Sequence, residues 1–405
     1  MSKNVFYKIF FLIITCIAVQ GNLWSQNINL VPRPLDMQTT GKETFTITPK
    51  TVISVENDEQ KTIAEYFSSL FILPGGFAPS IVVNGNADIV FQTEQTMKPE
   101  SYSLQVKKNG ILIKAADSSG FFYAVQTLRL TLPAQIENRV ARQDTNWTIP
   151  AMEISDGPRF SYRGLMLDVS RYFLPKEEVL KIIDCMALLK LNKLHFHLTD
   201  DNGWRIEIKK YPRLTEVGAW RVNRENFAFP DRRNPSPEES TPIGGYYTQE
   251  QMKEIIAYAQ QRQIEIIPEI DMPAHSNAAL AAYPEYACPV VKKFIGVLPG
   301  LGGSNADIIY CAGNDKTFEF LPLTYLCIWI AELLCNSRYF KTTYKAYIKL
   351  CAAYFYSLSS EVIVCVTSLI ALLISELASP IPLANFWTST ATTANTYTHG
   401  LQICP

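Results

Sequence analysis

The sequence has no excess of either charge. Its 405 residues include 37 Lys and Arg and 38 Asp and Glu, for a net charge of −1. Proteins that bind nucleic acid through its phosphates usually carry a surplus of basic residues, so this balance does not favour such a partner. The nine cysteines match neither a zinc-binding pattern nor a dense disulfide framework.

Long apolar runs are also missing. The run from Ile9 to Val19 follows two lysines and is too short to cross a bilayer, so residues 1–25 are predicted to be a signal peptide. A lipoprotein signal is the alternative because Cys16 lies in this run, but its neighbours do not fit the usual small-residue context. We therefore expect export to the periplasm or the extracellular space.

Residues 27–157 are predicted to form a small α+β domain. Several short runs rich in Thr, Ile and Val indicate strands, and Asn109-Gly110 is a favoured hairpin turn. The predicted elements are strands or hairpins within 44–55, 81–91, 102–106 and 111–115, and a helix at 120–132. Converging polar residues are not evident in this stretch, so a supporting role is favoured over a separate binding domain.

Strands and helices alternate after Asp156-Gly157-Pro158. The predicted elements are strands at 164–169, 193–198 and 264–270 and helices at 175–190 and 248–262. This order favours parallel pairing. It predicts an α/β fold, the N-terminal part of a (β/α)8 TIM barrel spanning residues 158–321. A doubly wound sheet is the alternative, but no glycine-rich phosphate turn follows the first strand.

The second strand of this region carries the first group of candidate site residues. His195 and His197 share one face and are expected to point into the barrel, and Asp200 and Asp201 follow where the strand ends. Burying these groups is costly unless they are paired or used. Alternatively, the two histidines fill the inside of the barrel as buried polar residues that are hydrogen-bonded to the protein and have no role in a site.

The third strand ends in a second group of ionisable residues. Glu269, Asp271 and His275 lie within seven residues of one another, and two prolines stiffen the backbone there. Their spacing fits no recognised metal site, so we predict acid–base or hydrogen-bonding roles. We predict no metal and no cofactor.

Arg163 and Trp204 are the remaining candidates. The guanidinium of Arg163, at the start of the first strand, is suited to holding neighbouring hydroxyls, although a lone arginine is more often a surface or salt-bridge residue. The ring of Trp204 is suited either to stacking on a ligand or to packing in the core. We expect Arg163, Asp200 and His275 to share one pocket.

Several motifs follow one another along the chain. They are Val31-Pro32-Arg33-Pro34, residues 120–130, Tyr162 to Arg171, His195 to Asp201 with Gly203-Trp204-Arg205, Gly244 to Thr248, Pro268 to His275, Ala312 to Asp315, and Thr317 to Leu321. In this order they resemble the supporting domain, the first three barrel strands and the approach to the fourth strand of the β-N-acetylhexosaminidases of glycoside hydrolase family 20.

The resemblance implies cleavage of terminal, non-reducing β-linked N-acetylglucosamine or N-acetylgalactosamine with retained configuration. In that family the substrate's own acetamido oxygen attacks the anomeric carbon, a Glu protonates the leaving oxygen, and the preceding Asp orients the acetamido group. The resemblance implies substrate-binding and supporting roles for the candidates above. Arg163, His197, Trp204, Glu269 and Asp271 would bind substrate, and Asp200, Asp201 and His275 would support the acid.

The family's adjacent Asp-Glu pair has no counterpart in its expected place. The last aspartate is Asp315, and the only adjacent Asp-Glu is Asp58-Glu59 in the N-terminal domain. Residues 322–405 hold only 7 charged residues in 84, against 68 in the preceding 321. We hypothesise that this cysteine-rich tail is read out of frame and that the chain is a truncated form.

Three functions remain open. The first is a hexosaminidase. The second is a catalytically silent glycan binder, for which uncovered barrel strands predict aggregation. The third is a membrane-tethered protein, although the longest uncharged apolar stretch of the tail, Val362 to Ser375, is shorter than a bilayer span.

Overall fold

The computed structural model describes residues 28–141, 145–224, 226, 235–299 and 308–320. The predicted signal peptide and the tail at 322–405 lie outside these residues. The chain forms two compact units. Of the described residues, unit 1 comprises those within 28–167, 174–197 and 254–269, and unit 2 comprises those within 168–173, 198–253 and 270–320.

Unit 1 begins with a seven-stranded sheet in the order β1-β7-β5-β6-β4-β2-β3. Its first half is antiparallel, and from β6 to β3 the strands are parallel. The strands are β1 (Asp36–Thr46), β2 (Val52–Val55), β3 (Ser80–Val83), β4 (Ile89–Thr93), β5 (Tyr102–Lys107), β6 (Gly110–Ala115) and β7 (Thr148–Asp156).

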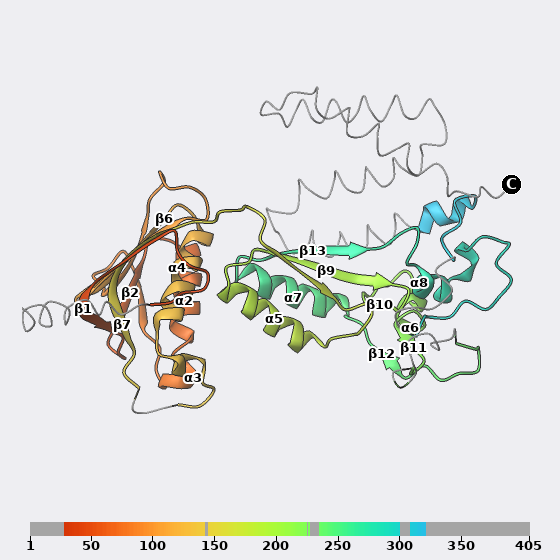
Figure 1. Ribbon diagram of the computed structural model, residues 1–405, viewed down its shortest axis with the longest axis horizontal. Coiled ribbons are helices and arrows are strands. Elements are labelled where there is room, and N and C mark those ends of the chain that lie inside the picture. Colours follow the sequence, from red (N-terminus) through yellow and green to blue (C-terminus); the bar gives the residue numbers. More distant parts are fainter. Residues whose placement is uncertain (1–27, 142–144, 225, 227–234, 300–307, 321–405) are drawn as a thin grey trace, which may run out of the picture. The chain divides into compact units, whose positions relative to one another are not determined.

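Two helices cover one face of this sheet (Figure 1). They are α2 (Asp58–Ser69), capped by the side chain of Asn57, and α4 (Ser118–Thr131), capped by Asp117. Buried aromatic and aliphatic side chains of both helices, such as Phe67 and Phe122, form the core against the sheet. The short helices α3 (Ile72–Gly75) and η1 (Ala134–Glu137) complete this part.

For this domain, the predicted hairpin turn and helix agree with the structure better than the predicted grouping of the strands does. The hairpin through Asn109-Gly110 is confirmed as β5 and β6, and the predicted helix is α4. The runs at 44–55 and 81–91 each contain two strands rather than one strand or one hairpin. For example, β1 pairs with β7 while β2 pairs with β3 and β4.

The strand–helix alternation after Pro158 is confirmed. It consists of β8 (Gly164–Asp168), α5 (Lys176–Leu188), β9 (Lys193–Asp200), α7 (Gln249–Gln260) and β13 (Glu265–Ile270). β9 pairs with both β8 and β13, and Figure 1 shows α5 and α7 on the same side of these strands. The start of α7 is a capping box, because Thr248 Oγ1 accepts from Gln251 N at 3.1 Å and Gln251 Oε1 accepts from Thr248 N at 3.0 Å.

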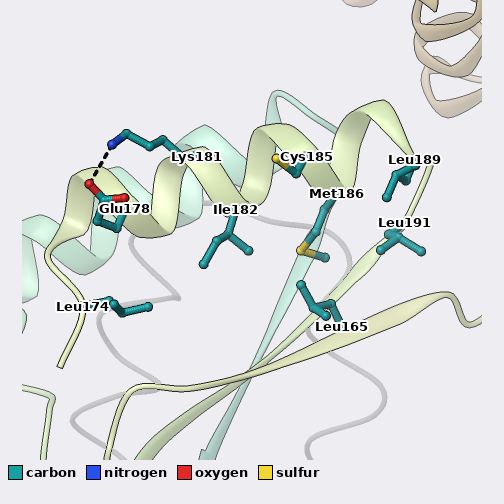
Figure 2. Close-up of a pocket in the computed structure, with 9 residues that line it drawn as sticks. All are labelled: Leu165, Leu174, Glu178, Lys181, Ile182, Cys185, Met186, Leu189 and Leu191. Carbon is teal, nitrogen blue, oxygen red and sulfur yellow. Dashed lines mark hydrogen bonds and ion pairs between the residues drawn. The ribbon is translucent and has the colours of Figure 1, made fainter. Parts of the chain in front are cut away.

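An apolar groove of about 530 Å³ lies between α5 and β8 (Figure 2). Its lining is hydrocarbon and thiol apart from Glu178 and Lys181, which pair with each other at 2.6 Å. Leu189 lines this groove and is 42% exposed. Within the described ranges β8 has only β9 as a strand partner, so one edge of β8 is uncovered there. The groove lacks converging polar groups and is not the candidate site.

Unit 2 is built from short elements. They are β10 (Gly203–Trp204), α6 (Arg213–Glu216), β11 (Trp220–Arg221), β12 (Ile243–Gly244), α8 (Asn277–Ala282) and η3 (Pro284–Tyr286). Phe320 is buried among four tyrosines, Tyr211, Tyr283, Tyr286 and Tyr310, with ring centroids 4.4–6.0 Å away. These rings join the segments around η3 to the end of the described chain.

Candidate active site

The first part of the site is the turn that follows β8. Asp168 ends the strand, and its Oδ1 accepts from Ser170 N at 3.0 Å, Ser170 Oγ at 2.8 Å and Arg171 N at 3.2 Å. Its Oδ2 accepts from Arg171 Nη1 at 2.8 Å. These bonds fix both the turn and the direction of the Arg171 side chain at the carboxyl end of the strand, where barrel enzymes carry their catalytic groups.

The second part is Asp200, at the end of β9. Its side chain is 2% exposed, and Oδ2 forms an ion pair with Arg171 Nη2. On its other side Oδ1 lies 3.3 Å from His275 Nδ1. Asp200 therefore joins an arginine and a histidine that come from different strand ends. We call Asp168, Arg171, Asp200, Asp201 and His275 the carboxylate–histidine cluster.

Asp201 is the second carboxylate beside His275. Its Oδ2 lies 3.4 Å from His275 Nδ1, and its Oδ1 accepts from Asn277 N at 3.1 Å. The backbone of His275 has φ 52°, an uncommon value for a residue with a side chain, and the imidazole is 54% exposed. Nδ1 therefore faces two carboxylates while the ring remains accessible. The prediction that Asp200, Asp201 and His275 come together is confirmed.

Two carboxylates of the cluster, Asp168 and Asp201, have pKa values shifted in opposite directions. Burial opposes ionisation of Asp168, but hydrogen bonds from Ser170 and Arg171 outweigh it and lower its pKa. Burial raises the pKa of Asp201, and Asp200 adds to the rise, while the Asn277 N–H and His275 oppose it. Asp168 is therefore held ionised, and Asp201 is the carboxyl that takes up a proton more readily.

These shifts predict opposite pH dependences for two identical substitutions. The lowered pKa of Asp168 contributes stability above 3.8, its ordinary value, and that contribution is lost as the pH falls through the lowered pKa. The raised pKa of Asp201 has the opposite effect: its contribution is complete below 3.8 and is lost as the pH rises through the raised pKa. Asp168→Asn should therefore lower the unfolding free energy by about 1–2 kcal/mol at pH 7 and by less at pH 3. The unfolding free energy of Asp201→Asn should increase relative to that of the parent as the pH rises from 3 to 7.

Urea unfolding of both variants and the parent between pH 3 and pH 8 measures this difference. Each variant controls for the other, because the chemical change is the same. Parallel pH profiles for the two variants would show that the opposite shifts are wrong.

A second polar cluster lies in unit 1. Glu269 Oε2 is 2.6 Å from His195 Nε2 and 3.8 Å from His197 Nδ1. The His197 side chain is 4% exposed, whereas those of His195 and Glu269 are 36% and 30% exposed. The prediction that both histidines share one face is confirmed, and Glu269 is the carboxylate that they share.

Asp271 directly follows β13. Its backbone N donates to Thr199 Oγ1 at 3.2 Å, and its carboxylate lies in the field of Arg171. Asp200, Asp271 and His275 each offer an atom within 4.8 Å of the others, which is close enough to share an ion. The guanidinium of Arg171, already paired with Asp200, disfavours a cation there.

The prediction that Arg163 binds substrate in this cluster is wrong. Arg163 precedes the amino end of β8, the opposite end from Asp168. Its guanidinium donates within unit 1 to Glu100 Oε2 (2.8 Å), Tyr123 Oη (2.8 Å), and the carbonyls of Lys190 (2.8 Å) and Phe160 (2.9 Å). Arg163 therefore ties β8 to the N-terminal sheet domain.

Replacing Arg163 should consequently affect stability rather than ligand binding. Arg163→Met leaves a carboxylate and two carbonyls without their donor, so we expect a loss of about 2–3 kcal/mol in unfolding free energy. Arg159→Met in the same loop is the control, because Arg159 is exposed and only lies over the Phe160 ring at 5.5 Å. Urea unfolding measures the loss. Equal stabilities of the two variants would contradict the assignment.

Trp204 packs in the core, which is one of its two predicted roles, and the substrate-binding role implied by the resemblance is wrong. Its ring is 3% exposed, and its Nε1 donates to the Ile206 carbonyl at 2.7 Å, so it packs in the interior of unit 2 and offers no surface for stacking. Arg171 is the residue that sequence reasoning missed. The available signal was its position: it follows the end of β8, whereas Arg163 precedes the start.

Two family models match the chain. The model of the glycosyl hydrolase family 20 catalytic domain matches residues 160–333, and the model of domain 2 of that family matches residues 27–157. The catalytic-domain match ends at residue 333, so it includes the first residues of the tail that is hypothesised to be read out of frame. Together the two models match well over half of the chain.

Characterised relatives agree with the models. A beta-hexosaminidase of Porphyromonas gingivalis is 40% identical over 347 residues, covering 79% of this chain and 42% of the relative. An N,N'-diacetylchitobiase of Vibrio harveyi is 42% identical over 192 residues, covering 47% of this chain and 21% of the relative. The chain thus spans less than half the length of these relatives.

A solved structure supports the fold prediction. The N-acetyl-beta-hexosaminidase of Streptomyces plicatus, in complex with Thio-NAglucal, aligns with a TM-score of 0.63 and 33% identity over 74% of this chain and 56% of that one. The predicted fold, a TIM-barrel catalytic domain preceded by a small α+β domain, is confirmed. The chain belongs to glycosyl hydrolase family 20.

Proposed function

We propose that this protein removes terminal, non-reducing β-linked N-acetylhexosamine from glycans by retaining, substrate-assisted hydrolysis. The observation that carries the proposal is the carboxylate–histidine cluster at the carboxyl ends of the first strands. The names of the relatives support the substrate class, since they include beta-hexosaminidases and a chitobiase.

Arg171 is the residue proposed to bind the sugar hydroxyls. Its side chain is 23% exposed, and its Nη1 and Nη2 are held by Asp168 and Asp200. Two carboxylates fix the plane of the guanidinium, and hydrogen bonds from a charged guanidinium to sugar hydroxyls are stronger than those from a neutral donor.

His275 is the residue proposed to support proton transfer. Nδ1 faces Asp200 and Asp201, so Nε2, on the opposite side of the ring, is directed away from them. The two carboxylates fix the orientation of the imidazole, as the aspartate does in an Asp-His pair of a catalytic triad. His275 would thereby hold a neighbouring acid in the right protonation state while the acetamido oxygen displaces the leaving group.

A catalytically silent glycan-binding chain is the second candidate, favoured by the missing Asp-Glu pair. The only adjacent Asp-Glu of the sequence forms the first turn of α2, where Glu59 accepts from Ser118 Oγ at 2.8 Å. These residues are exposed and lie in the first turn of a helix of the N-terminal domain. The chain would then retain the sugar-binding residues without the acid.

The test is an assay of the purified chain on a p-nitrophenyl β-N-acetylglucosaminide and on the matching β-glucoside. Substrate-assisted hydrolysis needs the acetamido group, so turnover is expected only for the first compound. Equal turnover of both would overturn the proposed mechanism. Binding of N-acetylglucosamine without turnover would favour the second candidate.

Export of the protein is also a proposal. It is supported by the basic and then apolar pattern of residues 1–25, which lie outside the described part of the structure. Within the described residues no helix is long and apolar enough to cross a membrane. Cell fractionation with N-terminal sequencing tests the proposal: a protein that starts near Gln26 in the periplasm or medium supports it, and an uncleaved cytoplasmic chain contradicts it.

A further inference from the structure

Two cysteines of unit 2 lie in direct contact. The sulfurs of Cys288 and Cys311 are 2.7 Å apart, although 23 positions separate them in the chain. Cys311 is 5% exposed, and Cys288 is half-buried. The third cysteine of the described ranges, Cys185, is exposed on α5 in unit 1.

The backbone around these cysteines brings them together. Ala287 and Tyr310 form an antiparallel bridge, and Cys311 N donates to the Tyr286 carbonyl at 2.8 Å. Asn314 Nδ2 donates to the Glu285 carbonyl at 2.9 Å on the far side of the pair. The rings of Tyr286 and Tyr310 both pack on Phe320. The thiol contact therefore follows from a fixed pairing of two segments.

The segment between the two cysteines reaches the carboxylate–histidine cluster. Leu298 N donates to the Asp201 carbonyl at 2.9 Å, and the Leu298 carbonyl accepts from Asn202 Nδ2 at 3.0 Å. A covalent link between Cys288 and Cys311 would thus anchor residues 288–299, which contact the turn carrying Asp201 through Leu298.

We propose that Cys288 and Cys311 are a modification site: they form a disulfide that fixes residues 288–299 against the Asp201–Asn202 turn. The oxidant is a disulfide, either of an oxidoreductase or of glutathione. The thiolate of one cysteine attacks the oxidant and releases one of its thiols, and the second thiolate then displaces the other. The pair loses two electrons and two protons, and the oxidant is reduced to two thiols.

Formation in the cell depends on the proposed export, because disulfides persist in oxidising compartments. The chemistry itself can be tested with purified protein, so failure of export and failure of the pairing are distinguishable. The full chain is equilibrated with reduced and oxidised glutathione, alkylated, and mapped by mass spectrometry without reduction.

The expected result is a Cys288–Cys311 link as the main disulfide, reversed by dithiothreitol, with a Tm higher by about 5–10 °C in the oxidised form. Cys288→Ser should expose Cys311 to alkylation and remove the dithiothreitol-dependent Tm shift. Cys185→Ser is the control and should leave both the link and the shift unchanged.

Two results would overturn the proposal. One is alkylation of both Cys288 and Cys311 in the glutathione-equilibrated protein. The other is preferential pairing of either with another cysteine. The same experiment in 6 M guanidinium chloride shows which disulfides the unfolded chain forms. Native conditions should enrich the Cys288–Cys311 link at least about tenfold over the unfolded chain. An identical distribution of links under the two conditions would contradict the pairing.

Discussion

Replacing Arg205 with methionine is expected to destabilise the protein by at least about 4 kcal/mol. Arg205 is 1% exposed and its guanidinium donates to backbone carbonyls from four separate segments of unit 2, each of which loses its partner in the variant. Burial, followed by the nearby Arg221, lowers the pKa of Arg205 to about 10, so it still carries its charge at neutral pH. The acceptors are the carbonyls of Val169 (2.9 Å), Ala219 (2.6 Å), Gly245 (3.1 Å), Ser170 (2.6 Å) and Asn202 (3.3 Å).

Two of these acceptors, Val169 and Ser170, directly precede Arg171 in the turn after β8. Loss of Arg205 should therefore disturb the carboxylate–histidine cluster as well as the fold. Urea unfolding and the yield of soluble protein measure the effect. Arg213→Met is the control, because Arg213 is exposed and only lies over the Tyr283 ring at 5.1 Å. An unfolding free energy of Arg205→Met within about 1 kcal/mol of that of the parent would contradict this role, because surface substitutions have effects of that size.

The second large effect concerns the leaving group of the substrate. A general acid typically contributes about 10²–10⁴-fold to the rate, and only where the leaving oxygen needs a proton. The family's Asp-Glu pair is not found in its context in this sequence. The chain is therefore expected to hydrolyse a 2,4-dinitrophenyl β-N-acetylglucosaminide far more readily than an alkyl one, since dinitrophenolate departs without protonation.

The comparison is the ratio of kcat/KM for these two substrates. A family 20 enzyme with an intact Asp-Glu pair is the control for their intrinsic reactivity. The ratio for this chain should exceed that of the control by at least about 100-fold. Matching ratios would mean that another carboxyl group of the chain acts as the acid.

Short-range patterns of the sequence predict the fold well. The turn at Asn109-Gly110 sets its hairpin, Thr248 and Gln251 cap α7, and the alternation of His195, Phe196 and His197 sets the two faces of β9. Each of these depends on residues close together in the chain. The neighbours of β1 and β2 do not, because each of these strands pairs with strands that lie far from it in the chain. β1 pairs with β7, more than 100 residues away, and β2 pairs with β3 and β4, 28 and 36 positions away.

The site was predicted in part for the same reason. Asp200, Asp201 and His275 follow strand ends, and parallel strands bring their carboxyl ends to one edge. The prediction for Arg163 depended on its residue type alone. Its position before the amino end of β8 argues against a site residue, because barrel sites lie at the carboxyl ends of strands. Its partners, Glu100 and Tyr123, come from a different domain and cannot be read from the motif. The Cys288–Cys311 contact likewise has no signal in cysteine spacing.

Ligand-observed saturation-transfer NMR on the full chain tests the central claim, that the carboxylate–histidine cluster holds a terminal N-acetylhexosamine. Methyl β-N-acetylglucosaminide should receive saturation from the parent protein and from Arg163→Met, and lose it in Arg171→Met when circular dichroism shows that variant to be folded. Transfer that persists in a folded Arg171→Met variant, or that is equally strong for methyl β-glucoside, would contradict the claim.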